Sequence, residues 1–309
     1  SAGPPREEVR ECILGSMIWQ ARYLEHHLEW DLRGNHLLEN LRALALLGAF
    51  FDGPDGRRWL ETTAALLPRQ LGEQVLPHGE HFERSPRYHA DMLEALLDMR
   101  DGLTDVLPEL ATRCDDSAAK MAAFLRFIAH PDGDVPLFGD SCLDQGEPIT
   151  QLLDWARAGD VAPEYGACTE QAARGSSGEA QVVGEYWRYR HGGDFLLFDA
   201  GPVGADPLPA HAHADLLTLE ASFEGRRLLV DSGVFSYDDE PVRRYCRSTA
   251  AHNVLQIDRT DQCDVYSRFR MGYRGWPSRL EAGRRHGFAW ARASHNGYRR
   301  LGAPQVGRW

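Results

Sequence analysis

The sequence predicts an α+β protein in which a helical half is followed by a strand-rich half. Up to about residue 158, apolar residues recur at helical spacing. Beyond residue 179, the apolar runs are short and separated by turn residues. Helices followed by strands, without alternation of the two, favour a helical layer packed on an antiparallel sheet. A chain of 309 residues commonly forms two domains.

The helical half contains seven segments with apolar residues on one helical face. Gly34 and the segment 52–55 act as turn signals between the first of them. Seven helices in succession predict antiparallel helical hairpins. The predicted helices cover residues 7–32, 35–51, 57–73, 86–100, 103–113, 117–130 and 148–158.

A small, polar segment at residues 172–179 separates the two halves, and it predicts a helical domain at 1–175 and a β domain at 176–309. The segment Phe223–Arg226 is typical of a hairpin turn. The predicted strands cover residues 195–199, 216–223, 227–230, 253–257 and 288–293.

The composition restricts the class of protein. Hydrophobic residues make up 43% of the chain and aromatic residues 10%, which is typical of a globular protein. No run approaches the roughly 20 apolar residues of a membrane span, and residues 1–8 contain no apolar signal core. The net charge of −12 argues against nonspecific nucleic-acid binding, and no glycine-rich nucleotide loop is present. The oligomeric state stays open.

The charge is unevenly distributed along the chain. Residues 241–309 contain 14 arginines, no lysine and 4 acidic residues, a balance of +10, so the remainder carries −22. This segment either presents arginines to an anionic ligand or forms an ordinary solvated face.

The six cysteines are widely scattered and form no C-x-x-C pair. We expect most of them to be free or buried, although their even number permits disulfides. They are Cys12, Cys114, Cys142, Cys168, Cys246 and Cys263.

Imidazoles and carboxylates gather in the strand-rich half. On a strand, His211, His213 and Asp215 would lie on one face, because side chains alternate with a period of two residues. Asp231 follows an apolar run, and His252 precedes a predicted strand. Histidine and aspartate are ligands that suit zinc, so the pattern indicates a metal or catalytic site; the alternative is a cluster of hydrogen-bonded histidines.

The helical half contains a second polar group. Asn35 and His36 follow Gly34 at a predicted helix start, where unpaired N–H groups favour anions, although Asn35 could simply be the N-cap. Tyr88 and His89 follow a proline at another helix start, where a tyrosine usually serves packing.

Five segments together resemble the heparinase II/III-like polysaccharide lyases and run in the order of that family. They are Arg33–Asn40, Glu83–Asp91, His211–Asp215, Val230–Tyr237 and Tyr245–Asn253. The resemblance implies an incomplete α/α toroid joined to an antiparallel β-sandwich. It also implies cleavage of uronic-acid-containing polysaccharides by β-elimination, and a periplasmic or secreted location. Both domains are shorter in this chain than is usual in the family, and we expect a truncated or partly represented member.

The resemblance also implies roles for individual residues. Asn35 and His36 would bind the uronate carboxylate, Tyr88 would act as general base and acid, and His211 would be a second base. A structural zinc ion would be held by His213, Asp231 and His252. Substrate contacts would come from Arg87, His89, Tyr237, Arg244, Tyr245 and Arg247.

Two other functions are compatible with the same residues. A zinc-dependent hydrolase would use the H-x-H-x-D motif, although Leu216 stands where one hydrolase type would have another histidine. A noncatalytic protein of the same fold would bind an acidic glycan without cleaving it. The sequence leaves the polymer open between glycosaminoglycan, alginate and bacterial exopolysaccharide, and endo against exo action.

Overall fold

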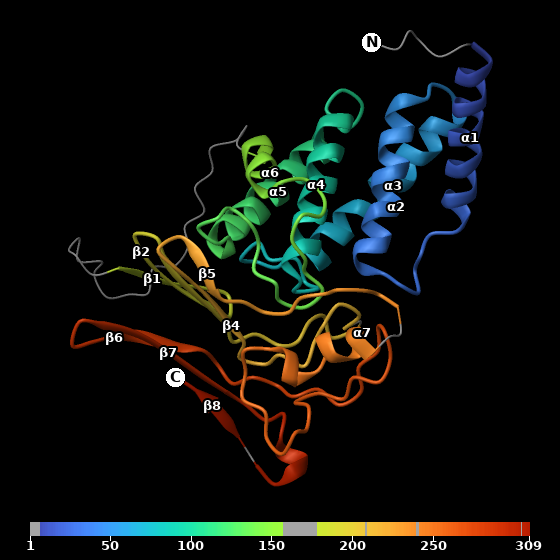
Figure 1. Cartoon of the computed structure of the whole chain (residues 1–309). Helices are drawn as coiled ribbons and strands as arrows, with labels where there is room; N and C mark the ends of the chain where they lie inside the picture. The colour runs from blue at the N-terminus through green and yellow to red at the C-terminus, as the bar shows by residue number, and fades with distance from the viewer. Residues whose placement is uncertain (1–6, 157–177, 208, 239–240, 304) are drawn as a thin grey trace. The chain divides into compact units, whose positions relative to one another are not determined.

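The structure, a computed structural model, describes residues 7–156, 178–207, 209–238, 241–303 and 305–309 (Figure 1). The chain divides into two compact units. Unit 1 consists of Ser1–Gln74 and Met92–Ala118, and unit 2 of Val75–Asp91 and Ala119–Trp309. Within the described residues, no helix combines the length and the apolar character that a bilayer span requires.

Unit 1 is helical. It contains α1 (Glu7–His26), α2 (Gly34–Phe50), α3 (Pro54–Gln74), most of α4 (Pro86–Leu103) and the first part of α5 (Pro108–Ile128). Helices α2 and α3 form an antiparallel hairpin, and Ala21, Leu44 and Trp59 are the buried residues that join α1 to it. The turn before α3 requires Gly56, because a Cβ there would lie 1.9 Å from the Phe51 carbonyl oxygen.

The helices differ from the prediction at two places. The first helix ends at His26 rather than near residue 32, and the two helices predicted at 103–113 and 117–130 are one helix, α5, which runs from Pro108 to Ile128. The acidic segment 115–116 does not break α5, because Leu110, Cys114, Met121 and Leu125 keep a single buried face along its whole length.

Unit 2 contains α6 (Ile149–Trp155), two antiparallel sheets, the short helix α7 (Pro241–Cys246) and the 3-10 turns η2 (Thr249–Ala251) and η3 (Arg299–Leu301). The first sheet runs in the order β1 (Glu179–Val183), β2 (Tyr186–His191), β3 (Asp194–Asp199), β4 (Leu219–Phe223) and β5 (Arg226–Leu229). The second sheet consists of β6 (Glu281–Arg285), β7 (Phe288–His295) and β8 (Val306–Arg308).

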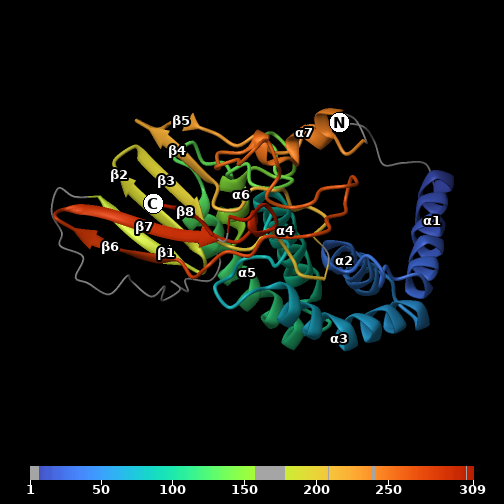
Figure 2. The same cartoon turned by 90° about the horizontal axis from the view of Figure 1, so that it is seen from below.

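The two sheets face each other as a β-sandwich (Figure 2). Trp187 and Phe198 of the first sheet pack with Ala291 and Ala293 of the second in one buried cluster. The opposite face of the first sheet packs on the end of α5, where the Phe124 ring lies 5.4 Å from that of Tyr186. The predicted fold class, helices followed by an antiparallel β-sandwich, is therefore confirmed.

The strands show where sequence patterns mislead. Strands β1, β2, β6 and β8 were not predicted, because they alternate charged residues with apolar ones or are very short. The predicted strand at 253–257 is wrong: Asn253 Nδ2 donates to the Leu219 carbonyl, and only an isolated bridge forms, between Ile257 and Thr260. The hairpin turn between β4 and β5 is confirmed, with positive φ at Glu224 and Gly225.

Two further predictions concern residues beyond those described. The domain boundary at 172–179 falls mostly on residues outside the described part, which ends at residue 156 and resumes at 178. Cys168 also lies outside it. The five described cysteines are free: Cys12, Cys114, Cys142, Cys246 and Cys263.

Trp187→Ala should destabilise unit 2, because Trp187 is only 6% exposed in the sandwich core. Emptying such a site lowers the free energy of unfolding by about 3–5 kcal/mol. Chemical denaturation measures the loss. The control is Phe288→Ala, also on the sandwich but 77% exposed, which we expect to cost much less. Equal losses in the two variants would contradict the packing described.

Candidate active site

The buried carboxylate of Asp140 is the centre of the polar cluster in unit 2. His211 Nδ1 lies 3.1 Å from one of its oxygens, and His213 Nε2 lies 2.7 Å from the other. The Arg243 guanidinium donates to both oxygens, with Nη2 at 2.9 Å. Burial opposes ionisation of Asp140, but hydrogen bonds from both histidines and Arg243 hold its pKa well below the ordinary value. Asp140 therefore remains a carboxylate.

Sequence reasoning did not identify Asp140. It lies in an irregular segment between α5 and α6, outside any motif considered. The adjacent glycine shows what holds the segment in place once the chain has folded. Gly139 has φ +55°, and a Cβ there would lie 2.8 Å from the His211 carbonyl oxygen, which accepts a 3.0 Å hydrogen bond from the Asp140 N–H.

A second glycine brings another segment to the same place. Gly233 has φ +56°, and a Cβ there would lie 2.2 Å from the Ser141 carbonyl oxygen. The same oxygen accepts a 3.0 Å hydrogen bond from the Val234 N–H. Because neither glycine can carry a side chain, three segments that are distant in sequence meet around Asp140.

Tyr88 and His211 form a stacked pair. Their ring centroids are 3.7 Å apart with an interplanar angle of 27°. The Tyr88 hydroxyl lies 3.0 Å from the Tyr237 hydroxyl, and His211 Nε2 lies 3.4 Å from Glu83 Oε2. Two groups that can transfer protons thus lie face to face.

Tyr88 is positioned by the start of α4. Pro86 is the first residue of this helix, and the Arg87 N–H donates to Ser141 Oγ at 3.1 Å, which ties the helix start to the Asp140 segment. Burial raises the pKa of Tyr88 to about 12, although its bond to Tyr237 acts in the opposite direction. At neutral pH, Tyr88 is a protonated hydroxyl that can donate.

The segment 211–215 is not a strand, which corrects the prediction. It is an irregular turn, yet both imidazoles still reach Asp140. Asp215 does not join them; it bonds to the backbone of Gly139, and burial raises its pKa to about 6. Shared contacts with one carboxylate, rather than strand geometry, bring the two histidines together.

The predicted zinc ligands lie close to one another. His252 Nδ1 is 2.8 Å from Asp231 Oδ1, and the ring centroids of His213 and His252 are 5.2 Å apart. Asp231 follows β5 as expected, whereas His252 follows η2 and precedes no strand. Within the described residues, His213 Nδ1 and His252 Nε2 are buried and accept no hydrogen bond. Two bare imidazole nitrogens beside a carboxylate are a donor set that suits zinc.

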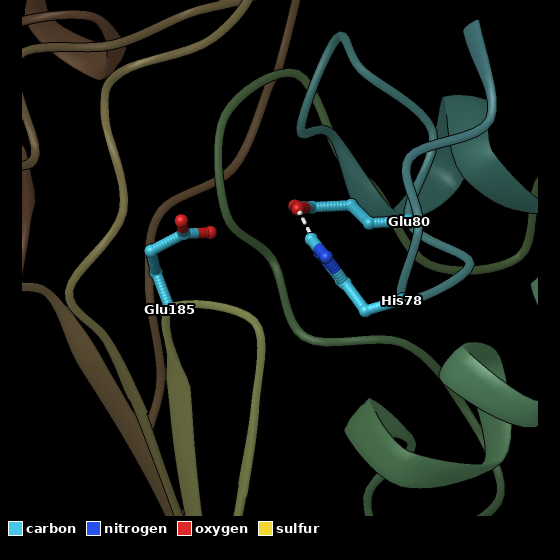
Figure 3. Close-up of side chains that lie close together, drawn as sticks. All are labelled: His78, Glu80 and Glu185. Atoms are coloured by element: carbon cyan, nitrogen blue, oxygen red, sulfur yellow. Dashed lines mark hydrogen bonds and ion pairs between the residues drawn. The ribbon is translucent and has the colours of Figure 1, made fainter. Parts of the chain in front are cut away.

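One other group could hold a cation by distance alone. Among the described residues, only His78, Glu80 and Glu185 have three potential ligand atoms within 4.8 Å of one another; Glu185 lies opposite the other two (Figure 3). Arg84 already pairs with Glu80 at 3.4 Å and with Glu185 at 3.2 Å. Tyr186 donates to Glu80 at 2.8 Å. These carboxylates therefore form an ion-pair network around an arginine. The predicted set of His213, Asp231 and His252 is less tightly grouped.

Three residues predicted to contact the substrate instead form hydrogen bonds or ion pairs within the protein. Arg87 is 3% exposed and pairs with Asp91 at 2.7 Å. His89 is buried, its Nε2 lies 2.9 Å from the Met121 carbonyl oxygen, and burial lowers its pKa to about 4. Arg247 is fully buried and donates to the Ala212 carbonyl at 3.0 Å. Burial therefore argues against direct substrate contact by these side chains.

The remaining predicted contacts occupy different positions. Tyr237 lies in the cluster, through its bond to Tyr88. Arg244 and Tyr245 are exposed on α7, where a ligand can reach them, and their role stays a prediction.

Asn35 and His36 belong to unit 1. They are the second and third residues of α2, and the N-cap is Arg33, not Asn35. His36 Nδ1 lies 3.2 Å from Glu29 Oε1. The positions of the two units relative to one another are not determined, so carboxylate binding by these residues stays a prediction.

Comparison with known proteins matches both parts of the chain to one family. The model of the heparinase II/III N-terminus matches residues 9–159, and that of the heparinase II/III-like C-terminal region matches residues 173–308. The chain is 30% identical over 268 residues to a heparin-sulfate lyase of Pedobacter heparinus, covering 80% of this chain and 39% of that protein. A heparin-sulfate lyase of Bacteroides stercoris is 25% identical over 248 residues, covering 74% and 36%. The chain belongs to the heparinase II/III-like family.

Solved structures share the fold. A mutant of a heparan sulfate lyase from Pedobacter heparinus has a TM-score of 0.64 and 23% identity, covering 93% of this chain and 45% of that one. A structure of heparinase III also has a TM-score of 0.64, with 19% identity and coverage of 90% and 47%. The chain therefore spans less than half the length of these relatives.

Asp140→Asn should destabilise unit 2 severely, because it leaves the buried Arg243 charge without its carboxylate. Breaking one side of a buried pair lowers the free energy of unfolding by about 3–5 kcal/mol. Asp206→Asn is the control, since Asp206 is 74% exposed beside Arg274; an exposed pair contributes about 1 kcal/mol or less. Denaturant titration compares the two. An equally small loss of unfolding free energy in Asp140→Asn would contradict the role of Asp140 as the centre of the polar cluster.

Proposed function

We propose that this chain is a polysaccharide lyase of the glycosaminoglycan-degrading type, which cleaves uronate-containing chains by β-elimination. The observation that supports it most is the Tyr88–His211 stack, with His211 held by Asp140. The names of the relatives support heparan sulfate or heparin as the polymer class. Alginate and bacterial exopolysaccharides lack such support.

The reaction requires two proton transfers and no water. A base removes the proton on C5 of the uronate, the electron pair forms the C4–C5 double bond, and the bond from C4 to the glycosidic oxygen breaks. An acid then protonates the leaving oxygen. The adjacent carboxylate resists loss of the C5 proton unless its charge is neutralised, so a lyase needs donors near it.

The geometry supports a division of these roles. With its pKa raised to about 12, Tyr88 is protonated and suited to donate a proton to the leaving oxygen. With Nδ1 directed to Asp140, His211 has Nε2 to accept the C5 proton, and Glu83 Oε2, 3.4 Å from Nε2, would stabilise the imidazolium that forms. This resembles the use of a carboxylate to fix the tautomer of a catalytic histidine. Tyr88 would serve as base only with additional help from a nearby cation.

We further propose a structural zinc ion held by His213, Asp231 and His252. The support is chemical: His213 directs Nε2 to Asp140, which leaves its Nδ1 bare, and the Asp231 carboxylate lies 2.8 Å from His252 Nδ1, a hydrogen bond that an ion bound by both residues would replace. Metal-bound histidines commonly donate their other N–H to a carboxylate in this way. The ion would hold the 211–213, 231 and 252 segments together and so orient His211. It would not activate water.

Tyr88→Phe should lower turnover by about 100-fold or more, the usual range for a positioned acid or base. The measurement is the ultraviolet absorbance of the conjugated double bond during incubation with heparan sulfate. Tyr23→Phe makes the same chemical change on α1, at a site that is 56% exposed, and it should turn over normally. Near-normal rates in a folded Tyr88→Phe variant would remove Tyr88 from this role. A saturated, hydrated product would indicate a hydrolase, and binding without cleavage a noncatalytic protein.

His252→Ala should lower zinc content and the melting temperature together. Elemental analysis gives the metal stoichiometry, and chelation of the unaltered protein should lower the melting temperature in the same direction. His286→Ala is the control, because His286 lies exposed in the turn between β6 and β7. Unchanged stoichiometry in His252→Ala would refute this ligand set.

A further inference from the structure

The hairpin loop 264–273 carries an exposed group of two arginines and an aromatic ring beside the Tyr88–His211 pair. Its two arms pair through the Asp264 N–H to the Tyr273 carbonyl and the Gly272 N–H to the Asp264 carbonyl, each at 2.8 Å. An isolated bridge between Val265 and Met271 continues the arms. The tip of the loop is solvent-exposed from residue 266 to residue 270.

Two buried guanidinium groups hold the backbone of this tip. Arg243 Nη2 donates to the Arg268 carbonyl at 2.9 Å, and Arg247 Nη1 donates to the same oxygen at 2.8 Å. Arg247 also bonds the Ser267 carbonyl. Because Arg243 is the partner of Asp140, the loop tip is connected to His211 through a single carboxylate and a single guanidinium. The tip is thus fixed relative to the candidate active site rather than being an independent surface loop.

The aromatic ring of the tip faces the active site directly. The Phe269 ring centroid lies 6.5 Å from that of His211 and 5.8 Å from that of Tyr237, on which it stacks at 22°. Phe269 nevertheless remains 41% exposed. A half-exposed ring beside the proton-transferring groups offers an apolar face on which a sugar ring can lie.

The charges of the tip are weakly compensated. Arg268 Nη1 lies 3.9 Å from Asp238 Oδ1, and the side chains are 50% and 77% exposed. Such a distant, exposed pair contributes little stability, so an anionic ligand can take the place of Asp238 at low cost. Within the part of the chain that the structure describes, Arg270 has no ion pair. Asp238 directly follows Tyr237, the residue whose hydroxyl bonds that of Tyr88.

We propose that Arg268, with Phe269 and Arg270, forms a binding subsite for an anionic group on the sugar next to the cleaved bond. The ligand class is an acidic glycan whose sulfate or carboxylate group pairs with Arg268 while its ring packs on Phe269. The arginine-rich balance of residues 241–309 gives this surface its charge, within a chain that is acidic overall. The position of this subsite next to the cleaved bond rests on the proposed lyase function, whereas the binding of an acidic glycan does not.

Binding is tested in a Tyr88→Phe background, in which the ligand is not consumed. The probes are a heparan sulfate oligosaccharide and an unsulfated oligosaccharide of the same backbone and length, titrated by calorimetry at two salt concentrations. Arg268→Gln should raise Kd for the sulfated probe by about tenfold and reduce the salt dependence. Asp238→Asn should tighten binding, because it removes the competing carboxylate.

The matched control is Arg292→Gln, an exposed arginine paired with Glu281 on the sandwich, which should bind as the parent does. If Arg268→Gln also binds as the parent does, the subsite is refuted. A loss of affinity confined to the sulfated probe assigns the recognised anion as a sulfate, and an equal loss for both probes assigns it as the uronate carboxylate.

The two proposals fail in different ways. Suppose that the parent binds the two probes through Arg268, but that the chain with Tyr88 intact forms no unsaturated product. The lyase function then fails and the subsite stands. If that chain forms the product while Arg268→Gln leaves Kd and KM unchanged, the subsite fails and the lyase function stands. Failure of the parent to bind either probe contradicts the subsite.

Discussion

The site depends on one buried negative charge. Asp140 receives His211, His213 and Arg243 on its two oxygens, and Arg243 in turn holds the backbone of the loop at 264–273. An isolated carboxylate would be very costly to bury, so Asp140 can be buried as a charged group only because these three partners bond to it. The same contacts orient the candidate base, the candidate zinc ligand and the exposed arginine loop. A substitution of Asp140 should therefore disturb the candidate base, the candidate zinc ligand and the loop at 264–273 together.

The fold supplies what the carboxylate needs. The β-sandwich and the end of α5 form an apolar scaffold, and the polar segments leave it at irregular turns instead of regular strands. Gly139 and Gly233 adopt positive φ where a side chain would strike a neighbouring carbonyl. These turns bring side chains from distant parts of the sequence to within hydrogen-bonding distance. Stability is provided by the sandwich, and chemistry by the loops that it positions.

Much of the architecture could be predicted from sequence, and the reasons for the failures are physical. Helical periodicity found α2, α3 and α4, because their buried faces repeat regularly. Strands β1 and β2 were missed because they are short and contain no continuous apolar run; two of the six residues of β2 are arginines, and one of these, Arg188, lies over the Phe127 ring. The histidine motif indicated two residues that the structure does bring together on Asp140, although its segment is a turn and not a strand. Asp140 could not be recognised, because a lone aspartate in a loop gains its meaning only from the groups that fold around it.

The most direct test is the protonation of His211, observed by nitrogen NMR of the protein with isotopically labelled histidine. If Asp140 orients this imidazole for proton transfer, the neutral ring should carry its proton on Nδ1, and Asp140→Asn should change that signal. A neutral His211 protonated on Nε2, or a signal indifferent to Asp140, would contradict the account.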